Sequence, residues 1–131
     1  MNFILTVCNG SKSRKIKNPS PEDIEQALDT LIPVLYYFVI LEAKEPVQNC
    51  VFVQTLITRG SAPEIKYVIE TRFEYENEFK QYKTYTNDVN YLKKMFRMFA
   101  LQENPDITGW TDITAELIEE SKKEPTGEKS A

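Results

Sequence analysis

The sequence contains no histidine, and this absence excludes a large part of enzyme chemistry. Without an imidazole, the chain has no Ser–His or Cys–His catalytic pair and no histidine ligand for a metal. Its two cysteines, Cys8 and Cys50, cannot form the usual four-ligand structural zinc site. We therefore expect no metal site and no cofactor. Both cysteines lie in segments typical of strands, so we predict free thiols.

Glycine is also scarce, with four residues in the chain. The sequence has no phosphate-binding loop, no dinucleotide fingerprint and no EF-hand spacing. The chain has sixteen Lys and Arg residues and twenty Asp and Glu residues, which gives a formal net charge of −4. This balance argues against nucleic-acid binding, which depends on clustered basic residues, and suits a basic protein partner. The composition favours protein binding over catalysis.

Long hydrophobic runs are missing as well. The longest apolar run, residues 33–41, is far shorter than the ~20 residues needed to span a bilayer. Residues 1–8 lack the basic leader and long apolar centre of a signal peptide. We expect a soluble, cytoplasmic protein with no membrane association. A chain of 131 residues suits one domain, which we place at residues 1–120, with a disordered polar tail at residues 121–131.

Two segments have the apolar spacing of amphipathic helices. The first begins where Ser20, a good N-cap, precedes Pro21, and an apolar stripe follows. The second begins near Thr86 or Asn87, either of which can cap it, and carries apolar residues at helical spacing from Val89 to Phe99. Both stripes predict packing against a common core.

Most of the remaining apolar residues lie in segments that predict strands. Four of these, residues 36–42, 49–58, 64–74 and 79–85, follow one another with short turns between them, one of them around Pro46. Residues 2–8 and 13–17 predict a further hairpin that turns at Asn9-Gly10. We expect an α+β fold, an antiparallel β-meander of about four to six strands with two main helices packed on one face.

Polar residues interrupt the predicted strands at Glu42, Gln54 and Glu70. Consecutive hairpins could bring these groups together, with Arg72 on the same strand face as Glu70. A buried carboxylate pair could then support acid–base chemistry, so a small carboxylate-dependent enzyme is one alternative. The simpler interpretation is that Glu70 and Arg72 face solvent or pair across the sheet. We expect no enzymatic activity.

Acidic residues are unevenly distributed, with four between residues 22 and 29 and six, without any Lys or Arg, between residues 103 and 120. The simplest interpretation is that these acidic runs lie on solvent-exposed surface. The more specific hypothesis is that they form an acidic docking surface for a basic partner. Trp110, the only tryptophan, suits a lid on the core or an interface anchor. The candidate partner-binding residues are Glu22, Asp23, Glu25, Asp29, Trp110, Asp112 and Glu116, of which Asp112 also suits a helix cap.

The order of several short segments along the chain supports a comparison with a known family. These segments are Asn18-Pro19-Ser20-Pro21, Ile40-Leu41-Glu42, Phe52-Val53-Gln54, Tyr67 to Arg72, a helix with Phe96, and Trp110 to Ile113. In this order the chain resembles the small bacterial immunity proteins of polymorphic toxin systems over residues 18–114. The resemblance implies a noncatalytic, cytosolic, antitoxin-like protein that binds and masks a toxin. Acidic members often face basic nucleases, so it implies a basic toxin domain as the partner. It carries over no individual binding residue.

A third alternative is a phage or host accessory protein that acts as a homo-oligomer, for which an apolar symmetric surface would be the sign. The sequence leaves the oligomeric state and the strand order open.

Overall fold

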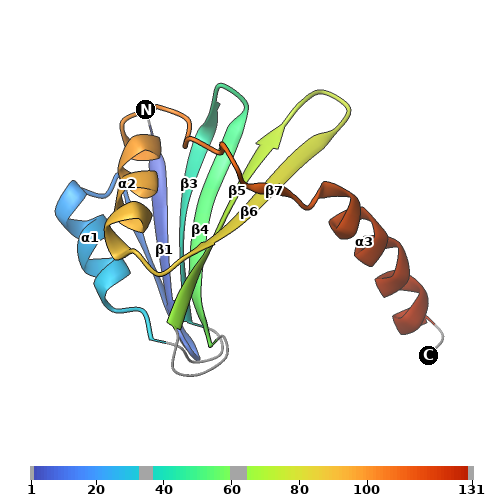
Figure 1. The fold of residues 1–131 in the computed structure, drawn as a ribbon, viewed down its shortest axis with the longest axis horizontal. Coiled ribbons are helices and arrows are strands. Elements are labelled where there is room, and N and C mark those ends of the chain that lie inside the picture. The colour runs from blue at the N-terminus through green and yellow to red at the C-terminus, as the bar shows by residue number, and fades with distance from the viewer. Residues whose placement is uncertain (1, 33–36, 60–64, 130–131) are drawn as a thin grey trace.

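A seven-stranded antiparallel sheet forms the centre of the computed structural model, which describes residues 2–32, 37–59 and 65–129 (Figure 1). The spatial order of the strands is β2-β1-β3-β4-β5-β6-β7. The predicted α+β fold is confirmed. The strands are β1 (Phe3–Asn9), β2 (Lys12–Lys17), β3 (Tyr37–Val47), β4 (Cys50–Arg59), β5 (Ile65–Glu74), β6 (Phe79–Thr86) and β7 (Thr111–Asp112).

The sheet has seven strands instead of the expected four to six, because β7 adds a strand that the sequence does not predict. The N-terminal hairpin joins the meander through β1, which pairs with β3 so that Leu5 lies opposite Leu41. At the other end, β7 adds two residues to β6, with Thr111 opposite Lys83. A two-residue strand has no periodicity of its own, so the sequence carries no signal for it.

The hairpin between β3 and β4 turns later than expected. Strand β3 continues to Val47, and Pro46 lies within an irregularity in the pairing between Glu42 and Val47. The turn is made by Gln48 and Asn49, whose φ angles of 49° and 76° are left-handed. Two consecutive left-handed residues are typical of the tight turns that connect twisted antiparallel strands.

Helices α1 (Pro21–Asp29) and α2 (Val89–Ala100) contact each other and pack against the sheet on one side (Figure 1). The predicted start of α1 is confirmed, because Ser20 and Asp23 form a reciprocal capping box with bonds of 3.0 and 2.9 Å. Helix α2 is capped by Asp88, one or two residues later than expected.

The core lies between this helix pair and the adjacent face of the sheet. Residues opposite each other in an antiparallel ladder share a face, so Leu5, Leu41 and Val53 form one row across three strands. All three are fully buried. Helix α2 covers them with the buried residues Leu92, Met95, Phe96 and Phe99.

A third helix, α3 (Thr114–Lys129), leaves the body of the molecule beyond β7 (Figure 1). It crosses the boundary expected at residue 120, so the structure has a helix where a disordered tail was predicted from residue 121. Glu and Lys, which dominate residues 116–123, favour helices even without an apolar stripe. Three expectations lie outside the described residues: Tyr36 and Glu64 as first residues of strands, and residues 130–131 of the tail.

Candidate functional site

The face of the sheet opposite α1 and α2 is the strongest candidate for a functional surface. The ladders place Ile40 opposite Gln54, Gln54 opposite Glu70, and Glu70 opposite Lys83, all on this side. We call it the open face. Its strand residues are Ile4, Thr6, Cys8, Ser13, Lys15, Lys17, Phe38, Ile40, Glu42, Phe52, Gln54, Leu56, Thr58, Lys66, Val68, Glu70, Arg72, Glu74, Phe79, Gln81, Lys83, Tyr85 and Thr111.

All four polar residues of the predicted strand cluster lie on the open face. Gln54 and Glu70 are direct cross-strand neighbours. Glu42 and Arg72 lie on either side of Phe52. Strand β4 and two positions along the strands separate Glu42 from Glu70, which places their Cα atoms about 12 Å apart by ordinary sheet spacings. The structure therefore brings the cluster to one surface without pairing its two carboxylates.

A chain of polar contacts runs between β5 and β6 on this face. The Nε2 atom of Gln81 donates to Glu70 at 2.6 Å, and Arg72 donates to the side-chain oxygen of Gln81 at 3.4 Å. The Nε atom of Arg72 also donates to Glu74 at 3.0 Å. Gln81 is 5% exposed, so its amide is held between its two partners. Sequence reasoning missed Gln81, because nothing in the sequence separates a bridging glutamine from a solvated one.

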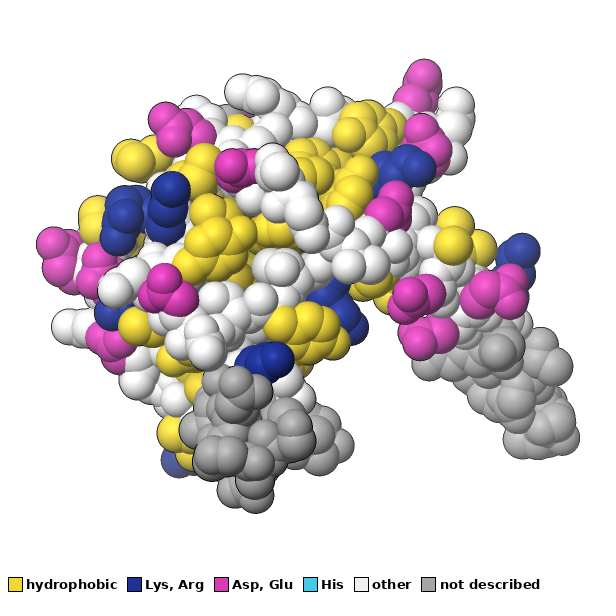
Figure 2. Space-filling model, in the orientation of Figure 1, with side chains coloured by type: hydrophobic (Ala, Val, Ile, Leu, Met, Phe, Trp, Pro, Cys, Tyr) yellow, Lys and Arg dark blue, Asp and Glu magenta, His cyan; other side chains and the backbone are white. Residues whose placement is uncertain are grey.

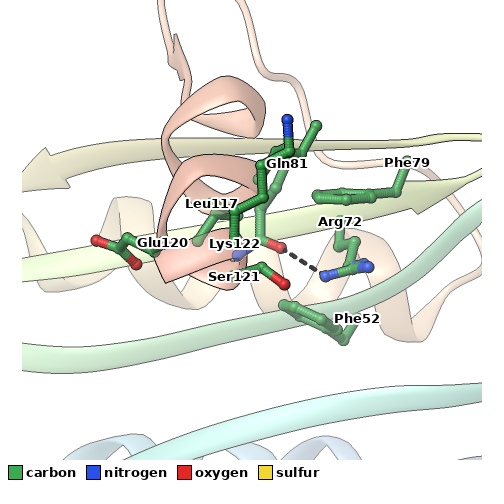
Figure 3. Close-up of a pocket in the computed structure, with 9 residues that line it drawn as sticks. Phe52, Arg72, Phe79, Gln81, Leu117, Glu120, Ser121 and Lys122 are labelled. Carbon is green, nitrogen blue, oxygen red and sulfur yellow. Dashed lines mark hydrogen bonds between the residues drawn. The ribbon is translucent and has the colours of Figure 1, made fainter. Parts of the chain in front are cut away.

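Arg72 is also packed between aromatic rings. Its guanidinium carbon lies 3.9 Å from the centre of the Phe79 ring, while Phe52 is its cross-strand neighbour on the other side. Figure 3 shows the Arg72 side chain between these two rings, facing α3 across an open space. Stacking on aromatic faces stabilises a guanidinium and fixes its orientation.

This space is a pocket of about 640 Å³ between α3 and the open face, which we call the α3 cleft. The sheet contributes Phe52, Arg72, Phe79 and Gln81, and α3 contributes Leu117, Ile118, Glu120, Ser121 and Lys122. The start of α3 is anchored here, since the backbone N–H of Gln81 donates to the Thr114 hydroxyl at 2.9 Å.

A second hollow, of about 210 Å³, lies further along the open face. It is lined by Phe38, Gln54, Thr55, Leu56, Val68 and Glu70. Leu56 is 41% exposed, and nearby in the same row Tyr85 is 52% exposed. Large apolar side chains left exposed beside polar groups are typical of surfaces that bind another molecule.

The acidic residues of α1 are largely engaged within the chain. The Lys93 ammonium lies 3.0 Å from Asp29 and 4.0 Å from Glu25, and Arg97 lies 3.9 Å from Glu25. Asp23 belongs to the capping box, and Glu22 is exposed. Around α1 and α2, acidic and basic side chains are intermixed (Figure 2). Two of the four acids of α1 therefore form ion pairs with α2, and the helix does not present a single acidic surface.

The remaining partner-binding candidates lie at the opposite end of the sheet. Trp110 packs on the core half-buried and donates from Nε1 to the Tyr91 hydroxyl at 2.9 Å. Asp112 accepts the N–H of Thr114 at 2.8 Å, and the hydrogen bonds from Thr114 lower the pKa of its carboxyl. Glu116 is exposed on α3. Since α1 and α3 lie far apart (Figure 1), the seven candidates do not share one surface.

Both cysteines are free thiols, as predicted, and they lie on opposite faces of the sheet. Cys50 is fully buried in the core, and burial raises the pKa of its thiol to about 11 although Thr71 and the Phe52 carbonyl bond to its sulfur. Cys8 is half-buried on the open face.

The fold and its surfaces define an α+β protein with a one-sided core. Comparison of the chain with protein-family models, with curated proteins and with solved structures finds no match. Among residues 2–32, 37–59 and 65–129, no group of three or more cysteine or carboxylate side chains is placed to hold a metal ion. Within the same residues, no helix has the length and apolar character needed to cross a bilayer.

Proposed function

We propose that this chain is a noncatalytic protein-binding module that binds its partner through the open face, and that it acts in the cytoplasm as an immunity protein that masks a bacterial toxin. One observation carries the proposal. Helices α1 and α2 pack on one face of the sheet, while the other face exposes apolar and aromatic side chains among polar ones.

The residues of the open face suit protein recognition. Aromatic residues and arginine are enriched in the centres of protein interfaces, and here Phe38, Phe52 and Arg72 lie on adjacent strands. The bonds from Arg72 to Gln81 and Glu74 hold its guanidinium in place before any partner arrives. A side chain that is already ordered loses less conformational entropy on binding.

The immunity role rests on the resemblance over residues 18–114. Two of the segments that carry it, Phe52-Val53-Gln54 and Tyr67 to Arg72, lie on β4 and β5 and supply much of the open face. Masking a toxin needs a complementary surface and no reacting groups, which agrees with the separation of Glu42 from Glu70. The resemblance also implies that the masked toxin domain is basic.

Co-expression with the toxin domain encoded beside this gene tests the proposal. We expect a stable complex and rescue of growth. Leu56→Asp, on the open face, should weaken the complex roughly tenfold or more, because it places a charge in an apolar contact. Leu101→Asp is the matched control, since Leu101 is 65% exposed just beyond α2. The lack of an adjoining toxin gene, or the lack of a complex with its product, would contradict the proposal.

A further inference from the structure

Resting on the proposed function, we infer that the segment of the partner that contacts the open face is acidic, with carboxylate side chains beside apolar ones. This goes beyond the net charge of the chain, which is −4 and by itself suits a basic partner. The inference depends on the difference in net charge between the open face and the rest of the folded chain.

The open face is positive within an acidic chain. Its strand residues include five cations and three anions, so it carries a net charge of +2, which leaves −6 for the rest of the chain. Charge complementarity between surfaces in contact governs partner choice more than the net charge of the whole molecule. The cations are Lys15, Lys17, Lys66, Arg72 and Lys83, and the anions are Glu42, Glu70 and Glu74.

Three of these cations lie against neighbouring side chains of the same face. The Lys15 ammonium donates to the Thr6 hydroxyl at 3.2 Å, and Lys83 lies 5.5 Å from the centre of the Tyr85 ring. Arg72 stacks on Phe79. They belong to β2, β5 and β6, so they flank the apolar centre supplied by Ile4, Ile40, Phe38 and Phe52. An apolar anchor with carboxylates on either side matches this arrangement.

The acids of the open face are less suited to holding a basic partner. Glu70 accepts from Gln81, and Glu74 is paired with Arg72. This ion pair neutralises both of its members, so the net charge of +2 comes from the four lysines against Glu42 and Glu70. Glu42 is exposed. The acids of α1 are similarly engaged, since Glu25 and Asp29 pair with Lys93. A basic toxin domain can still be the partner, provided that its contacting segment carries carboxylates.

Selection of a phage-displayed library of random 12-residue peptides on the full immobilised chain tests this inference. We expect enriched peptides that combine Asp or Glu with Leu, Phe or Trp. Synthetic copies should bind roughly tenfold more weakly to Lys83→Glu and to Lys15→Glu, and more weakly at high salt. Two variants on separate strands guard against a local fold defect, and circular dichroism checks each one. Lys94→Glu makes the same charge change at an exposed position of α2 and should bind like the unaltered chain.

Enrichment of basic peptides, no enrichment, or acidic peptides that bind Lys83→Glu and Lys15→Glu unchanged would overturn the inference. So would tight binding of a labelled oligothymidylate that the same two variants abolish, since this would assign the cations to nucleic acid. A complex with the toxin domain alongside any of these results would leave the proposed function standing. If acidic peptides are enriched but no complex with a toxin domain forms, the immunity role is wrong, and the preference of the open face for acidic segments still holds.

Discussion

The two faces of the sheet are built from alternate residues of the same strands, yet they differ in almost every physical respect. In β3 and β4, Leu41 and Val53 are fully buried beneath the helices, while their neighbours Ile40 and Gln54 point to the open face. Because the side-chain period of a strand is two, one segment can supply stability on one side and, in the function we propose, recognition on the other. Substitutions at two adjacent positions of a strand should therefore differ in kind: one should lower stability and the other should weaken binding.

The largest expected effect compares adjacent residues of β3. Leu41→Ala should lower the free energy of unfolding by about 2–5 kcal/mol, because it removes buried methyl groups and leaves a cavity. Ile40→Ala, on the open face, should cost clearly less, since Ile40 is only partly buried. Urea denaturation of both variants measures the difference. Equal losses would show that the open face is packed as the core is.

The alkylation rates of the two cysteines give a second comparison of the two faces. At pH 8, only about a thousandth of Cys50 is thiolate if its pKa is about 11, and the sulfur is buried. Cys8 is half-buried on the open face and should react with iodoacetamide at least roughly a hundredfold faster in the native protein. Mass spectrometry of the labelled peptides gives both rates. Similar rates before unfolding would contradict the burial of Cys50.

A smaller effect concerns two buried threonines in the core. The Thr71 hydroxyl donates to the Phe52 carbonyl at 2.9 Å, so Thr71→Val should lower stability by about 1 kcal/mol. The Thr55 hydroxyl has no hydrogen-bond partner among the described residues, so Thr55→Val should raise stability by about 1 kcal/mol. Thermal unfolding of the pair should give shifts of opposite sign, and shifts of the same sign would contradict this assignment.

The smallest effect concerns Asp112 at the start of α3. Its pKa is lower in the folded chain than its ordinary value of 3.8, so its carboxylate stabilises the fold above that value, and this contribution is lost as the pH falls through the folded pKa. Asp112→Asn should therefore lower stability slightly at pH 7, and its difference from the unaltered chain should shrink as the pH falls below 3.8. A difference that stays constant as the pH falls below 3.8 would assign the effect to something other than charge.

The elements with local signals were predictable from the sequence. Ser20-Pro21 begins α1 because capping depends on residues within one turn. Asn9-Gly10 marks the β1–β2 hairpin for the same reason, since Gly10 has a left-handed φ of 70°. The insertion of β1 between β2 and β3 was not predictable, because the β1–β3 pairing joins residues 28 to 40 positions apart and has no local signature.

The candidate site was predictable only in part. Glu42, Gln54, Glu70 and Arg72 stood out as polar residues in apolar strands, and they do share a face. Their registers, and with them the separation of about 12 Å between the Cα atoms of Glu42 and Glu70, depend on long-range pairing that a pattern cannot specify. The hypothesis of an acidic docking surface on α1 did not include Lys93 and Arg97 of α2, which lie against the acids of α1. Contacts between two helices have no signal in the sequence of either one.

Methyl NMR of the unaltered chain, titrated with the toxin domain that we expect to be encoded beside its gene, tests whether the open face or the helical side binds the partner. Leu56 and Leu101 are two exposed leucines, on the open face and beside α2 respectively. We expect large shifts for the methyl signals of Leu56, Ile40 and Val68, with those of Leu101 unchanged. Shifts concentrated at Leu101, with Leu56 unchanged, would contradict binding through the open face.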